Sequence, residues 1–145
     1  AEEIHAIAAK FGQAARRVQE AGFDGVEVHA GHHYFLHSFL SPVTNHRTDG
    51  YGGSLENRTR ILREIVEAIR AACGRDFPLM FRISLEEYIG KDGYHADTGI
   101  KICQMLEAGG WTPSTSPPPA PTVSSARAWS PCTIPRAGGS TWPRR

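Results

Sequence analysis

Apolar residues recur three and four positions apart in three stretches of the chain, which is the spacing of a helix with one buried face. The first stretch, residues 4–18, predicts an amphipathic helix that ends near Gly22. A second helix is predicted to begin at Ser54, a favourable N-cap residue, and to stop at Gly74. A third helix is predicted over residues 97–108, just before a pair of glycines.

Two short runs instead alternate apolar and polar positions and are rich in β-forming residues, which predicts strands. They cover residues 25–29 and 78–84. Successive side chains of a strand point to opposite faces, so one face of each strand is apolar and is expected to pack on helices. The other face carries His29 in the first strand and Arg82 in the second, each near the C-terminal end.

The order helix, strand, helix, strand, helix is typical of right-handed crossovers in a parallel sheet. No glycine-rich phosphate-binding motif follows either strand, which favours a (β/α)8 TIM barrel over a nucleotide-binding open sheet. A complete barrel takes about 250 residues. We therefore predict an α/β protein that is a partial barrel of about three helices and two strands, with its functional groups at the C-terminal strand ends.

The long connection over residues 30–54 is the main candidate for function, because loops of this length inside a compact domain are usually functional or disordered. Its aromatic residues argue against disorder. Together with the end of the first strand, it contains four histidines within nine positions: His29, His32, His33 and His37.

Three interpretations of these histidines remain open on local evidence. His29, His32 and His33 could bind a metal ion, because imidazoles at short spacing are common zinc ligands, although no carboxylate or thiolate recurs nearby at ligand spacing. Alternatively, His29 and His32 could hold a substrate carbonyl and stabilise developing negative charge, with Tyr34 as the proton donor. Finally, the histidines could be loop residues bonded to the backbone.

Composition divides the chain near Gly110. Residues 1–110 contain 12 basic and 15 acidic residues, whereas residues 111–145 contain four arginines, no acidic residue and eight of the ten prolines. We expect this Pro/Ser/Thr-rich tail to be irregular and to lack a stable core. Neither part has a concentrated basic field, so no nucleic-acid partner is expected.

Membrane insertion and export are not expected from the sequence. No stretch approaches the roughly 18 consecutive apolar residues of a membrane-spanning helix, and no signal-peptide pattern opens the chain. The three cysteines form no Cys-x-x-Cys pair, which gives no indication of a disulfide framework or a thiolate zinc site. A cytoplasmic location is the resulting prediction.

A specific resemblance emerges when the long connection is taken together with its flanks. The residues that carry it are at positions 25–29, 34, 39–42, 45, 47–49, 51–54 and 56–58. In this order they look like the signature of the Old Yellow Enzyme family of NADH:flavin oxidoreductases. They most resemble the branch that contains 2,4-dienoyl-CoA reductase and the 2-enoate reductases. The resemblance covers residues 1–110.

The resemblance implies a barrel that binds FMN, which NAD(P)H reduces and an α,β-unsaturated carbonyl compound reoxidises. By position, His29 and His32 match the pair that holds the substrate carbonyl. Tyr34 matches the tyrosine that protonates the α-carbon while the flavin delivers hydride to the β-carbon. Arg82 matches the strand arginine at the pyrimidine edge of the flavin.

Two residues, Arg82 and His33, complicate the assignment of the family's residue roles to this chain. Arg82 has a structural alternative, an ion pair with Glu27 or Glu86 inside the barrel. His33 stands where the family usually has glycine. If that position needs a positive φ, a histidine there costs about 1–2 kcal/mol and is expected to displace Tyr34.

After Gly110 the chain departs from the family pattern, in which a strand such as Val-Asp-Ala-Leu-His-Val-Ser would follow. Loss of one base converts codons for that strand into TGG ACG CCC TCC ACG TCT, which encodes the Trp-Thr-Pro-Ser-Thr-Ser of residues 111–116. We therefore interpret residues 111–145 as an out-of-frame translation, with a genuine linker as the alternative.

On this interpretation the chain is a fragment of a longer parent, and we expect it to be weakly folded and inactive alone. The missing strands, and in this branch a possible 4Fe–4S and FAD module, would belong to the parent. The competing functional class is an inactive remnant or a metal-binding barrel fragment.

Overall fold

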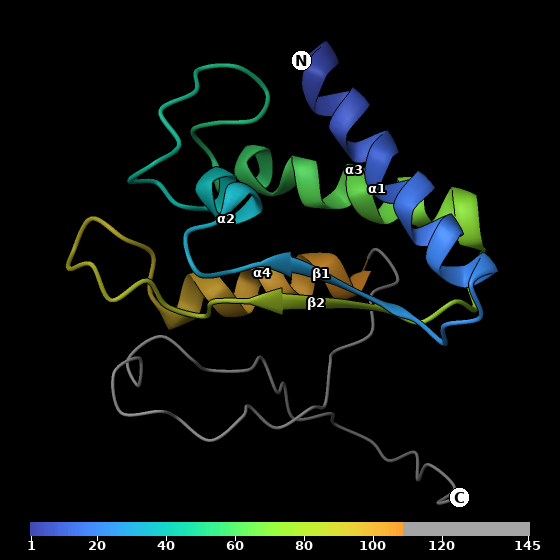
Figure 1. Cartoon of the computed structure of the whole chain (residues 1–145). Helices are drawn as coiled ribbons and strands as arrows, with labels where there is room; N and C mark the ends of the chain where they lie inside the picture. Colours follow the sequence, from blue (N-terminus) through green and yellow to red (C-terminus); the bar gives the residue numbers. More distant parts are fainter. Residues whose placement is uncertain (109–145) are drawn as a thin grey trace, which may run out of the picture.

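Within residues 1–108, two parallel strands pair to form a sheet, and their pairing sets the geometry of the site. The computed structural model describes residues 1–108, so the predicted boundary near residue 110 and the interpretation of residues 111–145 lie outside the described residues. The helices and strands follow one another as α1 (Glu2–Glu20), β1 (Val26–Ala30), α2 (Phe35–Leu40), α3 (Leu55–Cys73), β2 (Leu79–Ile83) and α4 (Ala96–Ala108) (Figure 1).

Strand β1 pairs with β2 in register from Val26 opposite Leu79 to Ala30 opposite Ile83. Alternate side chains of both strands are buried beneath the helices, as the alternating pattern predicts. Those buried residues are Val28, Ala30, Leu79, Phe81 and Ile83. The opposite face of the sheet therefore carries the polar positions, including His29 and Arg82.

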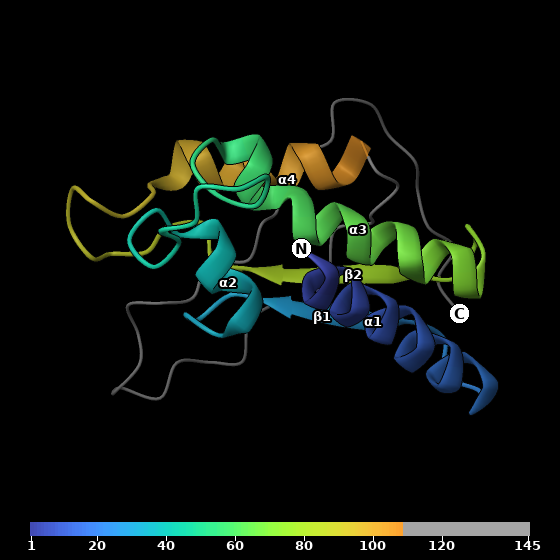
Figure 2. The ribbon, with the colours of Figure 1, turned by 90° about the horizontal axis from the view of Figure 1, so that it is seen from above.

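Helices α1 and α3 cover one face of the sheet, and α4 lies alongside α3 (Figures 1 and 2). The two long helices approach each other closely at Gly12, where an added Cβ would lie only 2.7 Å from the carbonyl oxygen of Ala68. Helix α3 begins as predicted, because the Ser54 side chain accepts a hydrogen bond from the Asn57 amide. It ends at Gly74, whose φ of 85° suits a residue without a side chain.

The prediction of three helices was incomplete, since the described residues contain four. Helix α2 lies in the segment that was predicted to be a loop. Its apolar residues Leu36, Phe39 and Leu40 have the three-and-four spacing of a helix and are all buried. Six residues are too few for this pattern to stand out from the sequence, and packing against α3 and β1 stabilises the helix instead.

The rest of the long connection is held by side-chain bonds to its own backbone. The side-chain amide nitrogen of the buried Asn45 donates to the carbonyl oxygens of Phe39 and Tyr51, both at 2.7 Å. Arg47 pairs with Asp49 through Nε and Oδ1 at 3.0 Å, and Arg58 donates to the Leu40 carbonyl. These residues therefore order the loop that follows α2.

Across residues 1–108, no helix combines the length and the apolar character needed to cross a membrane.

Candidate active site

The C-terminal halves of β1 and β2 bring the two predicted strand residues next to each other. His29 is the register partner of Arg82, although 52 residues separate them in sequence. Both side chains are half-buried. This edge of the sheet is where parallel α/β proteins place their ligands.

His29 and His32 form a hydrogen-bonded pair. Nε2 of His29 lies 3.1 Å from Nδ1 of His32, and the ring centroids are 4.8 Å apart. Burial lowers the pKa of both imidazoles, and the nearby Arg82 charge lowers each of them further. Both rings are therefore neutral at pH 7, and each has a single N–H. One of these is donated within the pair, so the ring that accepts this bond keeps its N–H for another acceptor.

Tyr34 completes the arrangement that the resemblance implied. Its ring centroid lies 5.4 Å from that of His29, at an interplanar angle of 58°. The residue is 64% exposed, at the N-cap position of α2, so a small molecule can reach its hydroxyl. The structure thus brings His29, His32 and Tyr34 together, with Arg82 beside His29.

The turn between β1 and α2 lies close to the end of β2. A Cβ added to Gly31 would lie 3.0 Å from the Ser84 Oγ and 3.1 Å from the Ser84 amide nitrogen. The same hydroxyl accepts a hydrogen bond from the His32 backbone amide at 3.0 Å. Glycine at position 31 therefore allows the turn to approach the second strand closely enough for this bond.

His33 has the left-handed backbone that the sequence comparison with the family suggested, with φ of 58°. The positive φ is therefore present, but the expected displacement of Tyr34 is not seen, because Tyr34 lies beside His29. The His33 ring stacks on the His37 ring, with ring centroids 4.6 Å apart.

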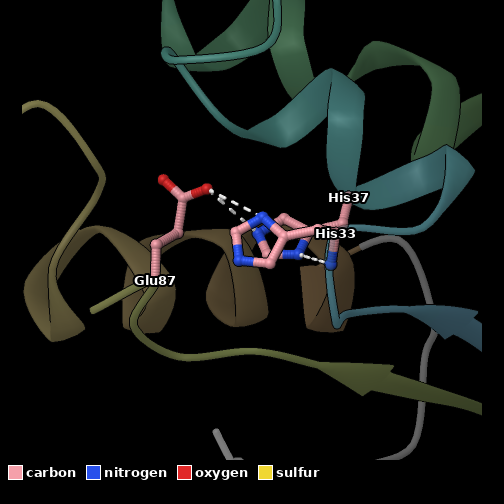
Figure 3. Close-up of side chains that lie close together, drawn as sticks. All are labelled: His33, His37 and Glu87. Atoms are coloured by element: carbon pink, nitrogen blue, oxygen red, sulfur yellow. Dashed lines mark hydrogen bonds and ion pairs between the residues drawn. The ribbon is translucent and has the colours of Figure 1, made fainter. Parts of the chain in front are cut away.

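The alternative metal-binding interpretation named His29, His32 and His33 as ligands, whereas the structure places His33 beside His37. Within the described part of the chain, the one group of three ligand-type side chains close enough to share an ion is His33, His37 and Glu87 (Figure 3). No carboxylate lies at ligand spacing in the local sequence, and Glu87 reaches the histidines from the loop after β2, far from them along the chain.

Three buried residues around this group were not assigned a role from the sequence: His37, Glu87 and Tyr94. The sequence showed His37 only as one of the four clustered histidines, and nothing in that cluster set it apart as buried. Glu87 and Tyr94 gave no signal, because they reach the site only through the pairing of β1 with β2.

Imidazole, phenol and guanidinium groups gather here at the C-terminal ends of adjacent parallel strands, which is where β/α barrels place their active sites. The sequence model of the NADH:flavin oxidoreductase / NADH oxidase family matches residues 1–116, and the chain belongs to this family. The resemblance to the Old Yellow Enzyme family is thereby confirmed.

Individual relatives agree with this assignment. The chain is 50% identical over 111 residues to the NADPH dehydrogenase of Bacillus subtilis (strain 168), covering 77% of this chain and 30% of that protein. It is 48% identical over 125 residues to the cinnamate reductase of Clostridium sporogenes, covering 76% of this chain and 19% of the relative.

A solved structure shows the same fold. The Old Yellow Enzyme homologue from Zymomonas mobilis matches with a TM-score of 0.67 and 35% identity, covering 76% of this chain and 31% of that one. The chain therefore spans less than a third of each of these three proteins.

Proposed function

We propose that this chain supplies the substrate-binding and protonating part of an FMN-dependent oxidoreductase that reduces the C=C bond of an α,β-unsaturated carbonyl compound with NAD(P)H. The observation that carries the proposal is the neutral His29–His32 pair, 3.1 Å apart, with the Tyr34 ring 5.4 Å from His29. The name cinnamate reductase, carried by one relative, supports this class of substrate.

The residues present are compatible with a flavin at the polar face of the sheet. Arg82 provides a permanent positive charge there, which suits the anionic edge of a reduced flavin. The buried Nδ1 of His29 has no hydrogen-bond partner among the described residues, so a polar atom remains for a bound group. When bound, FMN would supply the hydride for the β-carbon of the substrate.

His29 and His32 would act on the substrate carbonyl. A hydride added at the β-carbon moves negative charge onto the carbonyl oxygen, and N–H donors placed in advance stabilise that charge. Within the hydrogen-bonded pair, the ring that accepts keeps its N–H for the carbonyl oxygen, and it can donate there without losing a proton. The lowered pKa values of both imidazoles keep the pair uncharged at neutral pH.

Tyr34 would supply the proton that completes the reduction. A phenol O–H can donate to the α-carbon while the hydride arrives at the β-carbon, so that one hydride and one proton saturate the double bond. The exposure of Tyr34 leaves its hydroxyl accessible to a substrate lying over the pair.

A chimeric enzyme tests this function, because the chain spans only 30% of the Bacillus subtilis NADPH dehydrogenase. Residues 1–110 would replace the matching segment of that relative, and FMN content and NADPH-dependent reduction of cinnamaldehyde would be measured. We expect Tyr34→Phe to lower the rate of enone reduction about 10²–10⁴-fold, leaving flavin reduction by NADPH unchanged.

Tyr88→Phe is the matched control, because Tyr88 is a similarly exposed tyrosine with no assigned role. Equal rates for the Tyr34 and Tyr88 variants would contradict the proposed role of Tyr34. A chimera that folds but holds no FMN would contradict the proposed function itself. The coding DNA around the chain, translated in all three frames, would show whether the parent carries further strands and a 4Fe–4S and FAD module.

A further inference from the structure

Two consecutive residues of the turn before α2 have a left-handed backbone without being glycine. The φ angles are 57° at His32 and 58° at His33. Such a conformation costs about 1–2 kcal/mol per residue, and it persists only where the surrounding structure imposes it. The strain occurs at one member of the His29–His32 pair, so whatever holds the turn also positions that pair.

Both strained residues have their backbone amides bonded to side chains. The His32 amide donates to Ser84 Oγ at 3.0 Å, and the His33 amide donates to Nδ1 of His37 at 2.7 Å. The second bond is the shorter one, and its acceptor is 1% exposed. The buried His37 ring therefore fixes the left-handed backbone at His33.

The His37 ring is itself held from its other side. Because Nδ1 accepts a hydrogen bond, the neutral ring carries its proton on Nε2. Nε2 lies 3.1 Å from the Tyr94 hydroxyl oxygen and 3.4 Å from Oε1 of Glu87. The Tyr94 hydroxyl donates to the Ser84 carbonyl at 2.6 Å, which leaves its oxygen as the acceptor for the Nε2 proton.

Glu87 closes the network around Tyr94. Its Oε2 accepts the Tyr94 amide at 2.8 Å, and its own amide donates to the Tyr94 carbonyl at 3.2 Å. The loop after β2 therefore presents the tyrosine and the carboxylate to His37 as one bonded unit. Through His37, this loop is connected to the turn that carries His32 and His33.

A metal ion held by His33, His37 and Glu87 is the competing interpretation, since two imidazoles and a carboxylate are a common zinc ligand set (Figure 3). The hydrogen bonds argue against it. The His37 nitrogen that faces Glu87 is the protonated one, and a metal there would displace that proton. The single proton of the neutral ring would then be on Nδ1, which could no longer accept the hydrogen bond from the His33 amide.

We propose that His37 is a positioning residue: by accepting the His33 amide, it holds the left-handed turn that presents His29, His32 and Tyr34 to the substrate. The role rests on the proposed function of that trio. His37 acts through the backbone and contacts no reacting atom. Tyr94 and Glu87 keep its ring in the required orientation and tautomer.

Two substitutions of His37 separate positioning from simple packing. His37→Asn places an amide oxygen near the position of Nδ1 and keeps an acceptor for the His33 amide, whereas His37→Leu fills the space without one. In the 145-residue chain, we expect His37→Leu to accelerate hydrogen exchange of the His33 amide at least tenfold and to shift the NMR titrations of His29 and His32. His37→Asn should restore most of both properties.

Tyr94→Phe removes the hydroxyl that holds the His37 ring and changes the side-chain volume little. This variant tests the positioning role if His37→Leu does not fold. We expect a severalfold faster exchange of the His33 amide, because the Nε2 proton loses its acceptor. His95→Leu is the control, since His95 is an exposed histidine paired with Glu86 at 3.2 Å. That control should leave the His33 amide unchanged.

Three results would overturn the proposal. One is an unchanged His33 exchange rate in both His37→Leu and Tyr94→Phe. Another is a folded His37→Asn variant whose His33 amide exchange and His29 and His32 titrations differ from the unmodified chain as much as those of His37→Leu. The third is stoichiometric binding of added Zn²⁺ that is lost in His37→Leu, because His37 would then be a ligand. None of these readouts needs flavin, so a failure of the proposed function would be seen separately, in the chimera.

Discussion

His29 on β1 lies directly opposite Arg82 on β2 in the parallel register, so a titratable imidazole and a permanent positive charge share one edge of the sheet. The charge acts together with burial to lower the pKa of His29, and it also lowers the pKa of His32. Arg82 therefore has an effect on the histidine pair besides its proposed contact with a flavin.

Replacing Arg82 by methionine is expected to raise the pKa of both His29 and His32, because removal of a nearby positive charge favours the protonated imidazole. An NMR titration of the ring protons and nitrogens measures this directly. Arg82→Lys keeps the charge and should leave both titrations close to those of the unmodified chain. A lowered or unchanged pKa in the methionine variant would contradict the electrostatic effect.

His37 is expected to make stability depend on pH. Burial lowers its pKa to about 4 in the folded chain, against about 6.5 when unfolded. Between these values the unfolded chain binds a proton that the folded chain does not. The free energy of unfolding therefore falls as the pH drops below about 6.5, by about 2 kcal/mol at pH 5.

Urea unfolding at pH 7.5 and pH 5 tests this dependence. The His37→Asn variant should lose that part of the pH dependence, whereas His95→Asn, at an exposed histidine, should retain it. An unchanged pH dependence in His37→Asn would show that other groups are responsible.

His33→Gly is expected to stabilise the chain by about 1 kcal/mol, because glycine adopts a φ of 58° without the steric cost paid by histidine. The lost side chain is half-exposed, and its distance of 3.9 Å from Glu87 makes any ion pair weak. Tyr88→Gly, at an exposed residue with φ of 56°, should give a gain of similar size. Destabilisation by His33→Gly alone would mean that the His33 ring contributes more than its backbone costs.

Asn45→Ala is expected to destabilise the chain by about 2–4 kcal/mol, since it leaves the carbonyl oxygens of Phe39 and Tyr51 without their buried donor. Thr44→Val is the neighbouring control, because it removes a single exposed hydrogen bond to Ser38 and should cost less than about 0.5 kcal/mol. Equal effects in urea unfolding would show that Asn45 does not order the loop.

Local patterns were sufficient to predict much of this fold. The spacing of apolar residues placed α1, α3 and α4 within a few residues, and alternation placed His29 and Arg82 on the same face of adjacent strands. The resemblance to the family then named His32 and Tyr34, which the structure places beside His29. These features could be predicted because they depend on residues that lie close together in the sequence.

The remaining features depend on contacts between distant segments. Helix α2 has only six residues, and tertiary packing rather than its own periodicity stabilises it. The carboxylate of Glu87 and the hydroxyl of Tyr94 meet His37 across 50 and 57 residues, and nothing in either local sequence indicates that partner. Only the pairing of β1 with β2 brings them together.

The bond between the His32 amide and Ser84 Oγ spans 52 residues of chain. A ribosome synthesises the turn long before it synthesises the serine, and Tyr94 follows later still. During that interval the nascent chain has β1, His37 and the long helix α3. It still lacks the Ser84 hydroxyl that accepts the His32 amide and the Tyr94 hydroxyl that holds the His37 ring. The turn would therefore reach its final shape only after the loop beyond β2 has emerged, so the candidate site is among the last features to form during synthesis.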